Sequence, residues 1–268
     1  MNKFNKIASI TRRASLLAVC AAALAACGGG GGGGGGNGDT PNLVNPSAIL
    51  QNFWSGTVTN GADGATRASA VVMPDGTAWV AMESAAAVVG VAKVALSGTA
   101  IDADSASLTG TGNYYPLTPV NSPAQALTAA GTVTAASLTG TATTAAGTST
   151  LNWIPVTSPA FASAAQAADV QATWKAQFGG AVGEVTWIID GAGALTAGSQ
   201  SNLGCTYTGS VKPSAGSIAV FDVTAAEVCA GVTRNLAGIA TLNGAKTSLR
   251  VMYTADSDAR ANIAAFNK

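Results

Sequence analysis

Residues 203–211 read LGCTYTGSV. Every second residue from Leu203 to Val211 is apolar or small, and the residues between them are glycine, threonine and serine. A period of two predicts a β-strand with one face on a core and the other in water. The same alternation recurs at residues 173–178 and 248–253. The sequence therefore predicts antiparallel strands, each buried on one face only.

Turn signals separate these apolar stretches along the whole chain. They include Asp75-Gly76, Ser97-Gly98, Asp190-Gly191 and Asn243-Gly244, which supply positive φ at little steric cost. Their spacing of roughly 8 to 12 residues is typical of an all-β barrel or sandwich. Helical pattern is scarce, and only the alanine-rich residues 158–170 are long enough to form a turn or two.

The strand pattern divides into two similar halves. The expected strands of the first half are 51–59, 66–73, 77–82, 87–96, 106–115, 130–136, 138–145 and 148–154. Those of the second half are 171–179, 184–190, 194–200, 203–211, 217–223, 233–242, 246–254 and 260–266. Each half begins with a tryptophan strand, at Trp54 and Trp174, and then has an apolar strand that ends in an Asp-Gly turn.

Eight strands is about the number that closes into a barrel whose own side chains fill the interior. We therefore predict an all-β fold of two tandem antiparallel eight-stranded barrels, with an N-terminal module at 47–160 and a C-terminal module at 168–268. A single β-sandwich with long hairpins is the alternative.

The N-terminus has the three regions of an export signal. Basic residues come first, an apolar stretch follows at residues 14–23, and Leu24-Ala25-Ala26-Cys27 ends it. We predict that residues 1–26 are a signal peptide. The stretch 24–27 resembles the lipobox of bacterial lipoproteins, which implies that Cys27 becomes a lipidated N-terminus; an unmodified Cys27 in a cleaved secretory leader is the alternative. The apolar stretch is shorter than the roughly 20 residues that cross a bilayer, so the mature chain would be anchored rather than inserted. Nine glycines open the segment 27–46, which we expect to be a flexible tether.

The LAAC sequence resembles the lipobox of bacterial lipoproteins, and the layout of the whole chain resembles a group of surface lipoproteins. The transferrin-binding protein B and factor H-binding protein families share this plan: lipobox, glycine-rich tether, then threonine- and glycine-rich β modules with a cysteine pair in the last one. The resemblance implies an outer-membrane lipoprotein that is host-facing or binds a nutrient. It leaves open whether the protein faces the periplasm or the cell surface, and carries over no binding residue.

Cys205 and Cys229 are the cysteines that remain after cleavage at Cys27 and lipidation. An even pair in an exported chain predicts a disulfide. Cys205 is expected on a strand facing the core and Cys229 in a connection, so the bridge would tie a loop to the barrel wall. A metal or redox pair is the alternative, but the spacing is not C-x-x-C and the chain has no histidine to complete a site.

The absence of histidine also limits enzymatic function. It excludes Ser-His-Asp and Cys-His catalysis as well as imidazole general bases. Glu184 and Asp190 are the only carboxylates that share a predicted strand, and at about 20 Å apart they are too distant for glycosidase chemistry. We expect no enzyme, no cofactor and no metal. The five tryptophans are expected in the cores, or alternatively around a ligand.

The charge of the chain gives no sign of a strongly charged partner. Without the four basic residues of the leader, nine basic residues face thirteen acidic ones, a net charge near −4, with no basic cluster that would suit nucleic acid. We predict a non-enzymatic, lipid-anchored binding or structural module of the bacterial cell envelope. It would contact the membrane through its lipid, and its protein or small apolar ligand is not identified by the sequence. A lipocalin-like carrier of a small apolar ligand is the alternative, and a cavity lined by Trp and Leu would distinguish it from a filled structural barrel.

Overall fold

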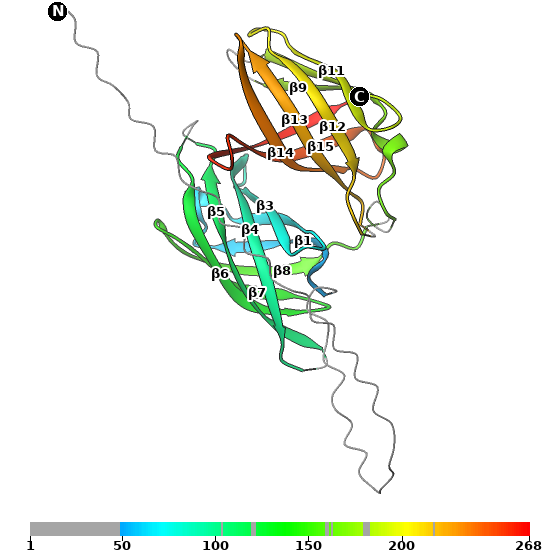
Figure 1. Cartoon of the computed structure of the whole chain (residues 1–268). Coiled ribbons are helices and arrows are strands. Elements are labelled where there is room, and N and C mark those ends of the chain that lie inside the picture. Colours follow the sequence, from blue (N-terminus) through cyan, green and yellow to red (C-terminus); the bar gives the residue numbers. More distant parts are fainter. Residues whose placement is uncertain are drawn as a thin grey trace, which may run out of the picture. The chain divides into compact units, whose positions relative to one another are not determined.

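The computed structural model describes residues 49–102, 104–118, 122–158, 161, 163–178, 183–216 and 218–268. These residues form two closed antiparallel barrels of eight strands each (Figure 1). The N-terminal barrel consists of β1 (Asn52–Thr59), β2 (Arg67–Val72), β3 (Thr77–Glu83), β4 (Val88–Ala100), β5 (Ser105–Pro116), β6 (Gln125–Thr134), β7 (Leu138–Thr144) and β8 (Gly147–Pro155).

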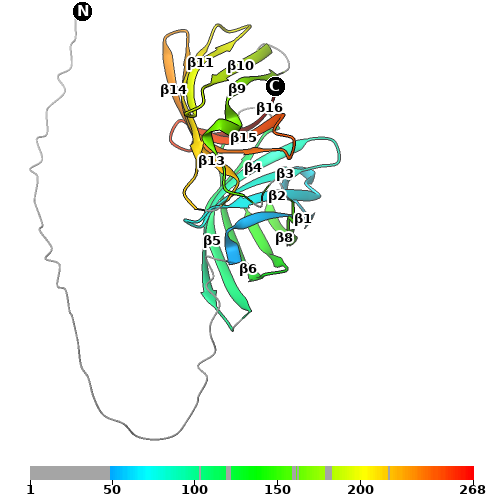
Figure 2. The same cartoon turned by 90° about the vertical axis from the view of Figure 1, so that its right-hand side faces the viewer.

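The C-terminal barrel repeats this arrangement (Figure 2). Its strands are β9 (Ala172–Phe178), β10 (Gly183–Ile189), β11 (Ala194–Gln200), β12 (Thr206–Pro213), β13 (Val220–Cys229), β14 (Val232–Leu242), β15 (Ser248–Ala255) and β16 (Arg260–Asn267). In both barrels each strand pairs with its neighbour in sequence, and the last strand pairs with the first. The prediction of two tandem barrels is confirmed, and the single sandwich is excluded.

The two barrels close differently. β1 and β8 are joined by six registered residue pairs, from Trp54↔Pro155 to Thr59↔Thr150. β9 and β16 are joined by one, Asn267↔Lys175. The seam of the C-terminal barrel is therefore held by far fewer backbone hydrogen bonds than the seam of the N-terminal barrel.

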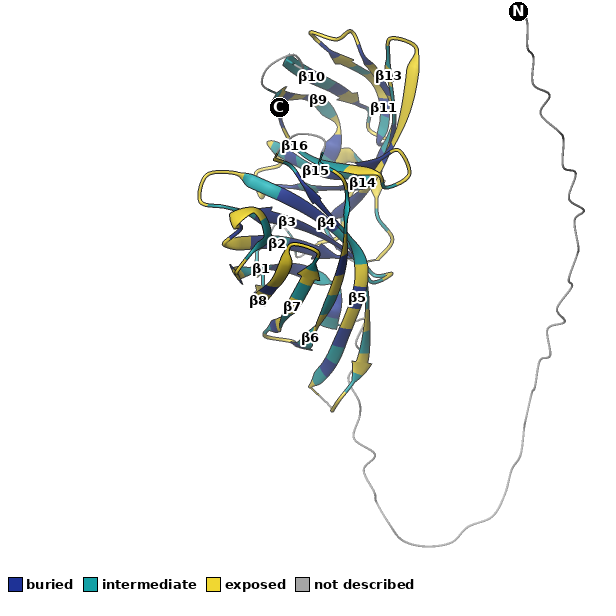
Figure 3. Cartoon of the chain, turned by 90° about the vertical axis from the view of Figure 1, so that its left-hand side faces the viewer, coloured by how far each residue is buried: buried dark blue, intermediate teal, exposed yellow. Residues whose placement is uncertain are grey.

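The barrel interiors follow the predicted alternation, which is visible as changing colour along β5 and β6 (Figure 3). Each barrel buries the tryptophan of its first strand completely. The indole N–H of Trp54 donates to the carbonyl of Leu50, and that of Trp174 donates to the carbonyl of Val170, in both cases four residues earlier. Val170 ends the 3-10 turn η3 (Ala167–Val170) and is itself buried. The two barrels thus share one structural feature: the segment before the first strand packs against the tryptophan of that strand.

A third apolar cluster draws on both barrels. Its buried members are Phe53, Val71, Met73, Trp79, Ala81 and Val91 from the N-terminal half, and Ile218, Val220, Ile239 and Met252 from the C-terminal half. The sequence pattern put Met252 on the wet face of its strand, and this was wrong because that face packs against the other barrel. Buried apolar contacts therefore join the two predicted modules.

Polar contacts surround this cluster. The guanidinium of Arg250 on β15 donates to Ser69 Oγ at 3.1 Å and to Glu83 Oε1 at 2.9 Å. Lys93 on β4 pairs with Asp258 at 2.9 Å. The Thr254 hydroxyl and the Lys93 ammonium lower the pKa of the Asp258 carboxyl, which favours the charged pair at neutral pH.

All sixteen predicted strands are present, with shifted ends. β13 continues to Cys229, so Cys229 lies on a strand and not in a connection as predicted. β12 begins at Thr206, which leaves Leu203 in the preceding turn and 54% exposed instead of facing the core. The turn is set by Gly204, whose φ of +64° a strand residue cannot adopt.

Cys27, the signal peptide and the tether lie outside the described residues. Among the residues that are described, none forms a helix long and apolar enough to cross a membrane.

Candidate functional site

The interior of the N-terminal barrel contains an apolar cavity of about 70 Å³. Its walls are leucines, valines and alanines together with Met82, Tyr114 and Trp153. One side, formed by β6 and β7, carries small residues such as Ala129, Gly131 and Gly140. Small side chains leave this part of the interior unfilled, which creates the cavity.

The polar side chains that border this apolar cavity are those of Tyr114, Thr141, Thr144, Ser149 and Trp153. The Trp153 indole N–H is buried and has no acceptor among the described residues. The Ser149 hydroxyl donates to the carbonyl of Asn60 at 3.1 Å. The Tyr114 hydroxyl donates to Asp63 Oδ2 at 2.7 Å, and burial, followed by this carboxylate, raises the pKa of Tyr114 above its ordinary value. A buried Trp N–H normally has a hydrogen-bond acceptor. The Trp153 N–H, which has none among the described residues, is therefore available to a bound ligand.

The C-terminal barrel carries a row of polar side chains across three strands. Glu227 on β13 is directly opposite Tyr207 of β12 and directly opposite Arg234 of β14. The Tyr207 hydroxyl donates to Glu227 Oε1 at 2.7 Å, and Arg234 Nη1 lies 3.6 Å from Glu227 Oε2. We call Tyr207, Glu227 and Arg234 the polar row. Because Phe221, Val223 and Ala225 point inward on β13, the period of two places Glu227 on the inner face as well.

The polar row lines a pocket of about 370 Å³, which we call the polar pocket. Gln200 and Tyr253 also line it, and Gln200 Oε1 lies 3.3 Å from the Tyr207 hydroxyl. Tyr115 and Leu117, from β5 and the residue after it, complete one side.

Tyrosines in the polar pocket are held in the neutral form. Burial, followed by the charge of Glu227, raises the pKa of Tyr253 to about 12. Burial and the hydrogen bond to Glu227 raise the pKa of Tyr207 above its ordinary value. Both hydroxyls therefore keep their protons beyond the pH of about 10 at which an ordinary tyrosine ionises.

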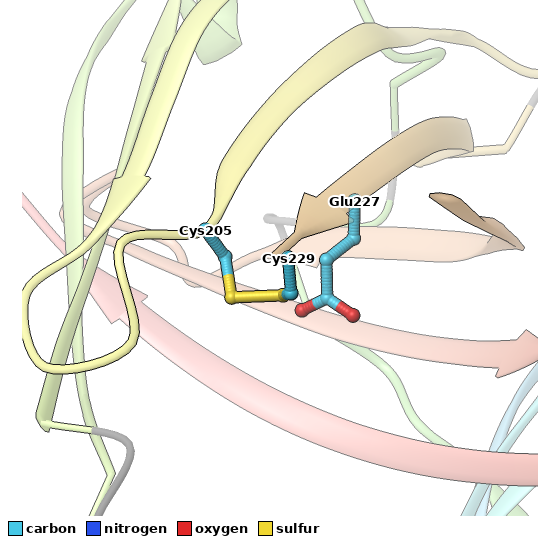
Figure 4. Close-up of side chains that lie close together, drawn as sticks. All are labelled: Cys205, Glu227 and Cys229. Atoms are coloured by element: carbon cyan, nitrogen blue, oxygen red, sulfur yellow. A yellow bond between two sulfur atoms is a disulfide. The ribbon is translucent and has the colours of Figure 1, made fainter. Parts of the chain in front are cut away.

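The predicted disulfide between Cys205 and Cys229 is confirmed, with a Cα–Cα distance of 4.3 Å. It joins β13 to the residue before β12, two residues beyond the Tyr207–Glu227 pair, so it lies beside the Glu227 carboxylate (Figure 4). The two sulfurs and a carboxylate oxygen lie within 4.8 Å of one another. Both sulfurs are bonded to each other, so the thiolates that a metal would need are not available in this state.

The other carboxylates considered in the sequence have structural roles. Glu184 accepts from Gln177 at 2.7 Å and pairs with Lys175 at 3.4 Å. Asp190 accepts two backbone N–H groups of its own turn, from Ala192 and Ala194. The structure brings neither into a pocket with the other.

All five tryptophans are buried, as expected for core residues, and they have different surroundings. Trp153 lines the apolar cavity, whereas Trp79 belongs to the cluster between the barrels.

The polar row was not predicted from the sequence. Its signal was a glutamate at an inward position two residues before a cysteine.

No protein-family model and no curated protein matches the sequence. The fold comparison finds a structure of Aeromonas veronii immune modulator A, which is 13% identical in sequence and superposes with a TM-score of 0.32. The match covers 83% of this chain and 98% of that one. Likeness at this level carries no information about function.

Proposed function

We propose that this protein is a lipid-anchored, non-enzymatic binding protein of the bacterial cell envelope whose N-terminal barrel holds a small, mostly apolar ligand. The observation that carries the proposal is the apolar cavity inside a closed barrel, bordered by the buried Trp153 N–H, which has no acceptor in the part of the chain that the structure describes. A purely structural barrel would have a filled interior.

The size of the apolar cavity limits its ligand. Its volume of about 70 Å³ exceeds the roughly 10–15 Å³ that one water requires. It is smaller than the roughly 300–1,000 Å³ of pockets for larger ligands. A small ring or the end of a hydrocarbon chain fits this volume, and a carbonyl or ether oxygen would accept from Trp153.

The test compares two ring compounds of nearly equal shape, cyclohexanone and methylenecyclohexane. Both should raise the melting temperature of the protein, because a ligand that binds only the folded state stabilises it. Cyclohexanone should bind about fivefold more tightly, since a hydrogen bond contributes about 1 kcal/mol. Trp153→Phe should abolish this difference while methylenecyclohexane still binds.

Ala129→Leu is the second variant, because the larger side chain fills the cavity. It should remove binding of both compounds without lowering the melting temperature of the unliganded protein by more than a few degrees. If neither compound shifts the melting temperature of the parent protein, the carrier proposal fails and a structural module remains.

The lipid anchor has its own test. Cys27→Ser should abolish palmitate labelling and leave an uncleaved or soluble protein. Unchanged labelling would remove the anchor from the proposal without affecting the barrel. Native mass spectrometry of protein from its own cells would detect a ligand that copurifies with it.

A further inference from the structure

The polar pocket of the C-terminal barrel has the features of a second, chemically different binding site. Its volume of about 370 Å³ lies within the usual range for small-molecule pockets. It combines apolar and aromatic walls with several convergent polar groups. The Glu227 side chain is 16% exposed and pairs with Arg234, which is 45% exposed, so the cost of burying charge falls mainly on the carboxylate.

The charges of the polar pocket balance. Glu227 accepts a hydrogen bond from Tyr207 and pairs with Arg234, and Asp256 and Arg260, which also line the pocket, lie 3.6 Å apart. Two acids and two bases leave no net charge to attract an ionic ligand. An apolar ligand is unfavourable as well, because it would take water from a carboxylate and a guanidinium without replacing its hydrogen bonds.

A neutral ligand that both donates and accepts hydrogen bonds satisfies these groups. A carboxylate has about four acceptor positions and a guanidinium has five N–H donors, so both groups keep capacity after pairing with each other. Their planar, forked shape suits two adjacent hydroxyl groups. Tyr253, which lines the pocket and is partly exposed, adds aromatic surface for the C–H side of a sugar ring.

The disulfide holds this arrangement in place. Cys229 lines the polar pocket, and the bridge to Cys205 fixes the end of β13 two residues after Glu227. A carboxylate at the end of a strand would otherwise move as the strand end frays. The bridge therefore preorganises the acceptor for its ligand.

We propose that the polar pocket binds a neutral, hydroxyl-rich ligand of the size of a mono- or disaccharide. This site is separate from the apolar cavity and from the ligand proposed for it.

The experiment is isothermal titration calorimetry on the full mature chain with glucose, N-acetylglucosamine and maltose as probes. Choline and glutarate are the charged counterparts. At least one sugar should bind with a Kd on the order of millimolar or tighter, and neither ion should. Glu227→Gln should weaken the sugar at least tenfold, because a hydrogen bond to a charged group is replaced by one to a neutral amide.

Asp63→Asn is the matched control. Asp63 also accepts from a tyrosine hydroxyl at 2.7 Å, but in the N-terminal barrel, so sugar affinity should stay within twofold. The Cys205→Ala/Cys229→Ala variant, measured where it is folded, should also weaken the sugar. If Glu227→Gln does not fold, Tyr253→Phe replaces it and should weaken binding as well.

Three results would overturn the proposal. These are no binding of any sugar, tighter binding of choline or glutarate than of the sugars, and sugar affinity that Glu227→Gln or Tyr253→Phe leaves unchanged. Trp153→Phe separates this proposal from that of the apolar cavity, because it should leave sugar binding intact. Loss of cyclohexanone binding alone would not bear on the polar pocket.

Discussion

The N-terminal barrel keeps its carboxylate–tyrosine pair, Asp63 with Tyr114, beside an apolar cavity, whereas the C-terminal barrel places Glu227 and Tyr207 in a row with Arg234 across its inner face. Both barrels begin with a buried tryptophan that bonds to a carbonyl four residues earlier. The scaffold is thus repeated, and the interiors differ. The comparison teaches that one closed barrel can provide an apolar or a polar interior through a few inward positions.

The largest expected effect tests whether the two barrels are equivalent. Trp54→Ala and Trp174→Ala should each lower the free energy of unfolding of their own barrel by about 3–5 kcal/mol, the usual cost of removing a buried tryptophan. Hydrogen exchange read by mass spectrometry distinguishes peptides of the two barrels. Trp54→Phe and Trp174→Phe are the controls, and a large loss at only one position would contradict the equivalence.

The disulfide should give the next largest effect, on one barrel only. Closing 24 residues contributes about 3 kcal/mol in the chain-entropy model, so Cys205→Ala/Cys229→Ala should destabilise the C-terminal barrel by about that amount. Exchange in the N-terminal barrel should not change. Non-reducing peptide mapping of the exported protein should recover Cys205 joined to Cys229, and two free thiols would refute the pairing.

Separating the barrels should destabilise each of them by less than the loss of the disulfide destabilises the C-terminal barrel. Fragments 47–160 and 168–268 should each give a β-rich circular dichroism spectrum and a cooperative melt, because each has its own core. Both should melt several degrees below the intact chain, since separation exposes Trp79 and Met252. Two disordered fragments that gain structure only on mixing would show that neither barrel folds alone.

The tyrosines predict how stability changes at alkaline pH. All four have raised pKa values, Tyr253 to about 12 against about 10 in the unfolded chain. Above pH 10 the unfolded chain loses these protons before the folded one does. Stability from this source is therefore complete below pH 10 and decreases as the pH rises through the folded pKa.

Phenolate absorbance should show no ionisation step at pH 10 until the protein unfolds. Tyr253→Phe should reduce the slope of the free energy of unfolding against pH between about 10 and 12. Four tyrosines that ionise at pH 10 in the folded protein would contradict the prediction.

The smallest effect concerns the ion pairs between the barrels. Arg250 and Glu83 are 34% and 28% exposed, so water screens their attraction, and Arg250→Gln should cost at most about 1 kcal/mol. A double-mutant cycle with Glu83→Gln measures the pairwise term. A coupling of several kcal/mol would mean that polar contacts, rather than the apolar cluster, hold the barrels together.

The strands could be predicted from the sequence because a barrel wall with one buried face imposes a period of two. Two features could not. Met252 lies on a second buried face, and an alternating pattern does not show whether its other face meets water or another domain. The expected strand 217–223 ended before Glu227, whereas β13 continues to Cys229. Glu227 is a charged residue at an inward position, so the apolar alternation does not extend to it.

Among the described residues, one registered pair joins β9 and β16, so we expect this seam to open more readily than the six-pair seam of the other barrel. An opened seam would present two sheet edges, and an edge is a template for adding a strand from another molecule. In concentrated samples we expect exchange of residues 260–267 between two copies, which would give a swapped dimer while each barrel keeps its usual set of strands. Six pairs between β1 and β8 give the N-terminal barrel no comparable route to self-association.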